Sequence, residues 1–84
     1  MLSVNYFASI REALGRSSEV LELPASVDDV QDLIDFLVTR DPQGFAVLAD
    51  DSKVLVAVDQ TVVDRTHQLQ GNEEVAFFPP MTGG

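Results

Sequence analysis

The chain contains no cysteine, so it can form no disulfide, no thiolate metal site and no cysteine nucleophile. Histidine is almost absent as well, because His67 is the only one and no second ligand type stands near it in the sequence. A metal site or a catalytic triad requires several partners. We therefore expect His67 to be structural or solvated and the chain to hold no metal.

Long apolar segments are also missing. No stretch approaches the roughly 18 apolar residues of a membrane span. The N-terminal residues lack the basic and apolar regions of a secretory signal. These absences predict a cytoplasmic protein with no membrane partner.

Positive charge is scarce, since five Lys and Arg stand against fourteen Asp and Glu and give a formal charge of −9. Phosphate backbones and anionic lipids repel such a polyanion, so we expect no nucleic-acid partner. The negative electrostatic field of the chain would instead speed the encounter with a protein that has a basic docking face, and would orient that protein. The alternative is that the acidity serves only solubility.

The length and the 45% apolar content suffice for one small domain with a modest core. Hydrophobic alternation and turn residues predict five strands, a short helix after the first strand and a long helix after the second. The short helix covers residues 8–14 and stops at Gly15, a natural C-terminal cap. The predicted strands cover residues 1–7, 18–23, 53–58, 61–63 and 74–78.

The long helix is the clearest predicted element. Ser26 offers a hydroxyl N-cap, and two carboxylates follow in the first turn. Asp41-Pro42 ends the helix, and the segment from there to Ser52 is predicted to be a loop with some irregular turns around Phe45, Val47 and Leu48. An apolar stripe along one side should pack on a sheet; it consists of Val27, Val30, Leu33, Ile34, Leu37 and Val38.

Elements of this kind can bury their apolar faces only if the helix packs across one side of a single mixed sheet. The predicted fold class is therefore α+β, with about five strands packed by one long helix. The first and last strands are expected to lie parallel and adjacent at the centre of the sheet. The C-terminal tail would then project from one end.

The C-terminus itself is the main functional signal. With glycine near 7% of average usage, Gly83-Gly84 would occur by chance at the end of only about 0.5% of chains. Without Cβ atoms, a double glycine can enter a narrow tunnel and present its carboxylate as a reacting group. The six residues 79–84 span up to roughly 20 Å when extended. The alternative is an inert, flexible end.

No other part of the chain carries a catalytic constellation. Solvated surfaces account for the helix carboxylates and for Asp50-Asp51, and no glycine-rich loop has the spacing of a phosphate cradle. The terminal carboxylate is a poor electrophile until it is activated. ATP-dependent adenylylation followed by attack of a sulfur donor would convert it into a thiocarboxylate, which needs nothing else from this chain.

Three segments carry a resemblance to a known family. Residues 74–84 resemble the C-terminal signature of the small subunit of molybdopterin synthase, the MoaD-type sulfur carriers with a ubiquitin-like β-grasp fold. Residues 6–15 resemble the first strand and the Phe-Ala-x-x-Arg-Glu turn of that family, and residues 56–60 resemble its Ala-Val-Asn segment. The chain departs from the family at Asp59, where Asn is usual, and at Gln68, where Pro is frequent.

The resemblance implies a set of partners. A MoeB-like enzyme would adenylylate Gly84 with ATP, and a sulfurtransferase carrying cysteine-desulfurase-derived sulfur would convert it into the thiocarboxylate. The charged tail would insert into a MoaE-type large subunit and give sulfur to cyclic pyranopterin monophosphate, within a heterotetramer of two small and two large subunits. The chain would be a sulfur donor that holds no permanent cofactor.

The resemblance also implies which residues act. Residues 1–78 would form the β-grasp domain and residues 79–84 the reactive tail, with Gly84 as the reacting residue. Phe7, Arg11 and Phe78 would contact partners, although both phenylalanines are equally compatible with the core and Arg11 with an ordinary surface charge. The residues expected to insert with the tail are Pro79, Pro80, Met81, Thr82 and Gly83.

Three other functions remain open from the sequence. One is a β-grasp carrier that supplies sulfur for thiamine or tRNA thiolation, against which the Phe-Phe-Pro-Pro run argues. Another is a ubiquitin-like modifier joined through Gly84 to lysines of target proteins. The last is an interaction module whose tail is inert.

Overall fold

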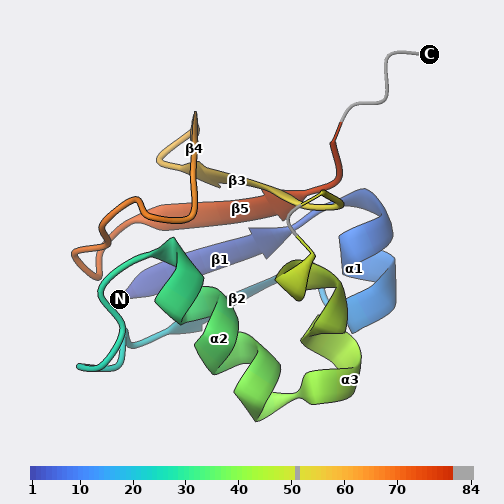
Figure 1. The fold of residues 1–84 in the computed structure, drawn as a ribbon, viewed down its shortest axis with the longest axis horizontal. Coiled ribbons are helices and arrows are strands. Elements are labelled where there is room, and N and C mark those ends of the chain that lie inside the picture. Colours follow the sequence, from blue (N-terminus) through green and yellow to red (C-terminus); the bar gives the residue numbers. More distant parts are fainter. Residues whose placement is uncertain (51, 81–84) are drawn as a thin grey trace.

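The computed structural model describes residues 1–50 and 52–80, and in this part the chain forms one five-stranded sheet (Figure 1). Every predicted strand is present, although three of them are shorter than expected. The strands are β1 (Leu2–Tyr6), β2 (Ser18–Leu21), β3 (Leu55–Val58), β4 (Thr61–Val63) and β5 (Glu74–Phe78).

The order of the strands across the sheet is β2-β1-β5-β3-β4. The two central strands, β1 and β5, are parallel, as the sequence predicted, and Tyr6 lies opposite Phe77. All other neighbours are antiparallel. Because β1 and β5 run in the same direction, both finish at the same end of the sheet.

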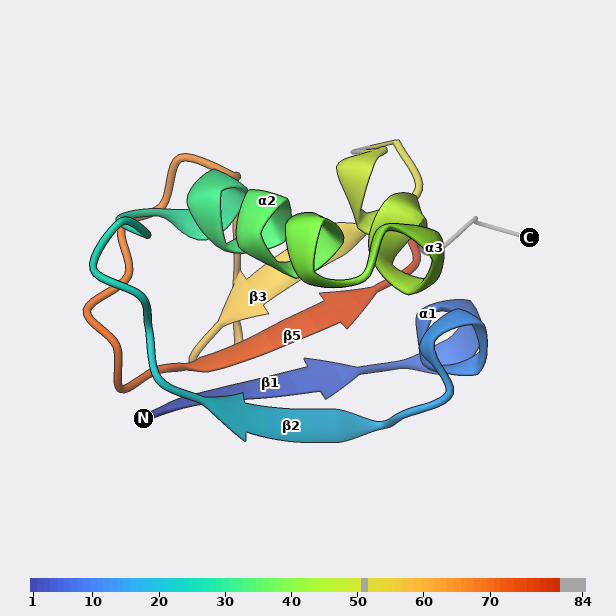
Figure 2. The ribbon, with the colours of Figure 1, turned by 90° about the horizontal axis from the view of Figure 1, so that it is seen from below.

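Helix α2 (Val30–Arg40) packs across one face of the sheet, as expected (Figure 2). Its N-cap is Asp29, whose carboxylate accepts from the backbone N–H of Asp32 at 2.8 Å, so the predicted cap at Ser26 was wrong. The helix does not begin earlier because Asp28 and Asp29 pair with the loop before β5: Leu69 N–H donates to the Asp28 carbonyl at 2.8 Å, and Asp29 forms an antiparallel bridge with Gln68.

The segment between α2 and β3 is largely helical, whereas a loop with irregular turns around Phe45, Val47 and Leu48 was predicted. It forms α3 (Pro42–Phe45) and a 3₁₀ turn, η1 (Ala46–Ala49), in which Phe45 and Leu48 are fully buried. Asp41 caps α3, and Pro42 occupies its first turn, where a missing N–H costs nothing. Pro42 therefore both ends α2 and begins α3, whereas the sequence pattern predicted only the end of α2.

The core lies between the sheet and these helices, which together cover one face (Figure 2). On β1 the buried residues alternate with half-exposed ones, as a sheet with one covered face requires. No helix covers the other face in the part of the chain described. The predicted helix stripe is buried except Val38, which is half-buried; the core includes Leu2, Val4, Tyr6, Ile10, Val27, Val30, Leu33, Ile34, Leu37, Val75 and Phe77.

None of the helices in the described part of the chain has the length and apolar character that crossing a membrane requires.

Candidate functional site

After β5, the chain leaves the sheet beside helix α1 (Ala8–Leu14), because α1 follows β1 directly and β1 ends next to β5 (Figures 1 and 2). We call the end of β5 at Phe78 the exit. The backbone N–H of Phe7 donates to the Phe77 carbonyl at 3.1 Å and extends the pairing of the two strands by one residue. The structure thus brings Phe7, Arg11 and Phe78, which are far apart in sequence, to the same end of the sheet.

Apolar side chains on the uncovered face surround this exit. Phe78 lies opposite Leu55, and the next row across β5, β3 and β4 contains Ala76, Ala57 and Val62. Phe7 is 48% exposed and Val62 is 61% exposed. We call Phe7, Leu55, Val62, Ala76 and Phe78 the exit patch.

The backbone geometry around α1 leaves the side chains of Phe7 and Arg11 exposed at the surface. Phe7 is the extended N-cap residue of α1, and the following Ala8 has φ +52°, a left-handed value that is uncommon outside glycine. The helix then turns Ile10 into the core and leaves Arg11 exposed. Gly15, at φ +71°, closes α1 with its N–H on the Arg11 carbonyl at 2.9 Å. Neither Phe7 nor Phe78, which is half-buried, belongs to the fully buried core.

The sequence did not reveal the remaining members of the exit patch. Sequence patterns place Leu55, Val62 and Ala76 in strands but do not assign them to a partner surface. The sequence feature that could have indicated an exposed apolar surface is β3, which is apolar on both faces although helices cover only one face of the sheet. Only the pairing register shows that these residues share a face with Phe78.

The tail is described as far as Pro80. Pro79 and Pro80 are both half-buried. The predicted tail residues Met81, Thr82 and Gly83 and the predicted reacting residue Gly84 lie outside the described residues.

A charged cluster lies under the exit, on the covered face. One oxygen of Glu19, Oε2, accepts from Tyr6 Oη at 2.7 Å, from Arg40 Nη2 at 2.8 Å and from Arg16 Nη1 at 3.3 Å. Burial alone would raise the pKa of Glu19, but the hydrogen bonds from Arg40 and Tyr6 outweigh it and leave that pKa below its usual value. Burial, reinforced by Glu19, strongly raises the pKa of the Tyr6 hydroxyl. The cluster ties β1, β2 and α2 together beneath the exit.

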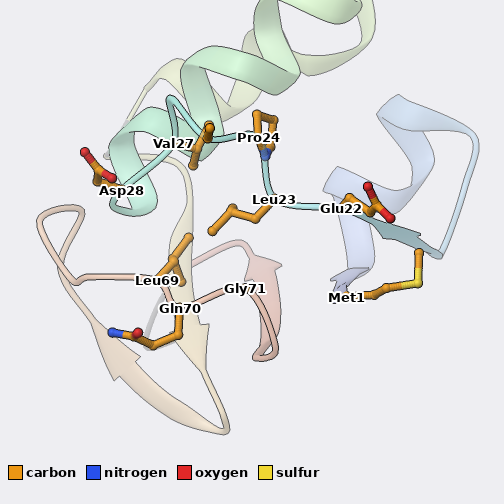
Figure 3. Close-up of a pocket in the computed structure, with 10 residues that line it drawn as sticks. Met1, Glu22, Leu23, Pro24, Val27, Asp28, Leu69, Gln70 and Gly71 are labelled. Carbon is orange, nitrogen blue, oxygen red and sulfur yellow. The ribbon is translucent and has the colours of Figure 1, made fainter.

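A separate cavity of about 530 Å³ opens at the other end of the sheet. Leu23, Val27 and Leu69 form apolar walls, with Glu22 and Asp28 on opposite sides (Figure 3). No lysine, arginine, serine or histidine lines it, so it offers no cationic side chain to anchor an anionic ligand. His67 is exposed and outside this cavity, and within residues 1–50 and 52–80 no three metal-ligating side chains gather.

Residues 4–84 match the ThiS family, which is nearly the whole chain. Two relatives bear the same name, molybdopterin synthase sulfur carrier subunit. The one from Escherichia coli is 38% identical over 84 residues and the one from Haemophilus influenzae is 31% identical over 84 residues, each covering 100% of both chains.

Solved structures confirm the predicted ubiquitin-like β-grasp fold. A putative molybdopterin converting factor subunit 1 from Pyrococcus furiosus superposes with a TM-score of 0.77 at 28% identity and covers 95% of this chain and 97% of its own. A Helicobacter pylori complex of subunits 1 and 2 of molybdopterin-converting factor gives a TM-score of 0.66 at 17% identity, with 99% and 97% covered. At that identity the second likeness concerns the fold.

Proposed function

The chain belongs to the ThiS family, and we propose that it is the sulfur-carrier small subunit of a molybdopterin synthase. The observation that carries the proposal is the similarity to sulfur carrier subunits over the full length of both chains, at 38% identity with the Escherichia coli relative. The Gly83-Gly84 terminus and the apolar surface around the exit of β5 support it.

The proposed chemistry takes place at Gly84. A MoeB-like partner uses ATP to convert the terminal carboxylate into an acyl-adenylate, with release of pyrophosphate. A persulfide on a sulfurtransferase then attacks the carbonyl carbon, and AMP leaves. A thiol of that partner cleaves the S–S bond of the resulting acyl disulfide, which releases the thiocarboxylate and leaves a disulfide on the partner. Glycine suits both steps because neither Gly83 nor Gly84 places a side chain between the carbonyl and the partner's catalytic groups.

We further propose that the exit patch and Arg11 form the docking surface for a MoaE-type large subunit in a heterotetramer. A large subunit docked on the exit patch would receive the tail in its active site, where the thiocarboxylate gives sulfur to cyclic pyranopterin monophosphate. Burial of an apolar patch supplies affinity, and the exposed Arg11 beside it supplies a directional charged contact. The chain itself holds no cofactor, and the reaction belongs in the cytoplasm.

Intact mass is the direct test of the chemistry. Purified chain is incubated with its activating enzyme, ATP and a sulfur source. Replacement of one terminal oxygen by sulfur should add about 16 Da to the C-terminal peptide. Unchanged mass despite release of pyrophosphate would contradict the sulfur-carrier proposal, and covalent conjugates to other proteins would favour a ubiquitin-like modifier.

Two tail variants test the requirement for a free Gly84. Deletion of Gly84, or addition of one alanine after it, should abolish molybdopterin formation. The thermal melt should not change, because the core lies entirely within residues 2–77. Normal synthesis by the extended variant would refute the proposed role of Gly84.

A further inference from the structure

The cavity of about 530 Å³ at the end of the sheet away from the exit is an open groove between two segments that are far apart in sequence. One wall comes from residues 22–28, which connect β2 to α2, and the other from residues 69–71, which precede β5. Leu23, Val27 and Leu69 give it apolar surface that a ligand can cover (Figure 3). We call this cavity the distal groove.

Hydrogen bonds fix both walls of the distal groove. The backbone N–H of Leu69 donates to the Asp28 carbonyl at 2.8 Å and joins one wall to the other. The Glu73 carboxylate accepts the backbone N–H of Gly71 at 2.8 Å and holds the second wall from behind. Because both walls are already ordered, a ligand would not lose affinity in ordering them.

The distal groove also carries negative charge that nothing in the described chain neutralises. Glu22 and Asp28 are exposed and lie on opposite sides of it (Figure 3). The ion pairs of the described residues involve other carboxylates, and the α-amino group of Met1, whose side chain also lines the groove, takes part in none of them. A ligand that complements this groove therefore brings both apolar surface and positive charge.

An arginine side chain has both properties. Its methylene stem can lie along the apolar walls while its charged end stays at the rim. The planar guanidinium carries five N–H donors and can face carboxylates on two sides, which the compact ammonium of lysine does less well. An arginine on a docked protein also suits an open groove better than a free small cation does, because the few contacts available would have to offset the whole loss of translational freedom of a free cation.

We propose that the distal groove is a docking site for an arginine side chain of a partner protein with a basic surface. The formal charge of −9 attracts such a partner and disfavours a second copy of this chain as the occupant. The groove lies where β1 begins, whereas the exit patch lies where β1 finishes (Figures 1 and 2). A partner held in the groove therefore leaves the exit patch uncovered. The inference does not depend on the sulfur-carrier chemistry.

Nuclear magnetic resonance titration of the ¹⁵N-labelled full chain tests the site, with the capped peptide acetyl-Gly-Ser-Arg-Ser-Gly-amide as the probe. Saturable shift changes should concentrate on the amides of Leu23, Val27, Leu69 and Gly71, with a millimolar Kd because a single exposed side chain makes few contacts. The same peptide with citrulline, a neutral isostere of arginine, should cause none. Raising the salt from about 20 mM to about 0.5 M should weaken the binding, because the charges are exposed.

Two double variants separate the groove from general attraction to an acidic protein. Glu22→Gln with Asp28→Asn removes the two charges of the groove and should weaken the binding of the arginine peptide about five- to tenfold. Glu12→Gln with Asp35→Asn removes two exposed charges outside the groove and should change the binding less than about twofold. Thermal melts should show that both double variants are folded.

Several outcomes would overturn the proposal. These are the absence of saturable shift changes, equal shift changes with the citrulline peptide, and equal weakening in the two double variants. Shift changes at the groove amides that grow with protein concentration in the absence of peptide would assign the groove to a second copy of the chain, and would overturn the proposal as well.

Discussion

At the scale of single residues, Glu73 shows how one buried carboxylate organises a loop that leads into the tail strand. It is 9% exposed, and its side chain accepts the backbone N–H groups of Gln70 at 2.7 Å, Gly71 at 2.8 Å and Asn72 at 3.1 Å. Burial by itself would raise the pKa of Glu73, but the N–H groups of Gln70 and Gly71 outweigh it and lower that pKa below its usual value. The charged form therefore stabilises the turn immediately before β5.

Glu73→Gln should lower the free energy of unfolding by about 2 kcal/mol at pH 7, because an amide cannot accept from three N–H groups as a carboxylate does. The lowered pKa means that the carboxylate contributes stability above the pKa of the unfolded chain, about 4.3, and loses it as pH falls through the folded value. The difference between variant and parent should therefore shrink from pH 5 to about pH 3.

Urea unfolding at several pH values measures this effect, with the exposed Glu74→Gln as the control. A difference that stays constant down to pH 3 would show that the charge of Glu73 does not carry the effect.

At the scale of elements, the turn between β3 and β4 sets the edge of the sheet on which Val62 lies. Its two residues, Asp59 and Gln60, have φ of +49° and +71°, which is the geometry of a type I′ hairpin turn. Asp59 Oδ1 also accepts from Glu74 N–H at 3.0 Å, while Asp59 N–H donates to the Glu74 carbonyl at 2.8 Å. The family departure at Asp59 therefore keeps both the left-handed turn and its link to β5.

Gln60→Gly should raise the free energy of unfolding by about 0.5–1 kcal/mol, because glycine adopts the required positive φ without steric cost. Gln43→Gly is the matched control: Gln43 is exposed in α3, does not have a positive φ, and its replacement should destabilise the helix slightly. Chemical denaturation of both variants measures the two changes. A loss of stability in Gln60→Gly would contradict the proposed turn energetics.

At the scale of the whole molecule, two exposed valines distinguish specific docking at the exit patch from nonspecific apolar association. Val20 is 60% exposed and Val62 is 61% exposed, and both lie on the uncovered face of the sheet. Val62 shares a row with Ala76 in the exit patch. Val20 lies on the edge strand β2, opposite Ser3 and toward the far end of the sheet.

Val62→Lys should weaken binding to the large subunit by at least about tenfold, since it places a charge in the proposed apolar interface. Val20→Lys should leave binding nearly unchanged. Titration calorimetry with the cognate large subunit gives both affinities, and melting curves confirm that both variants are folded. Equal losses in the two variants would exclude the exit patch as the specific docking surface.

The sequence by itself determined the five strands and the two main helices, and it predicted a reactive C-terminus. Alternation and turn residues predicted each strand. The parallel centre of the sheet followed from the apolar last strand and from the long helix that precedes the third strand. The absence of cysteine, metal-ligand clusters and phosphate loops from the sequence left Gly84 as the predicted reacting group, because a terminal carboxylate is a property of the covalent chain and not of the fold. The expected domain boundary at Phe78 and the role of Gly84 remain predictions.

Only the tertiary structure decided what surrounds the exit. Periodicity cannot tell which apolar face of β3 is covered, so the grouping of Leu55, Val62 and Phe78 depended on the pairing register. The preference for a hydroxyl at the N-cap also favoured Ser26 as the cap of α2. The helix begins at Val30 instead, because Asp28 pairs with Leu69. Contacts between residues distant in sequence decided both outcomes.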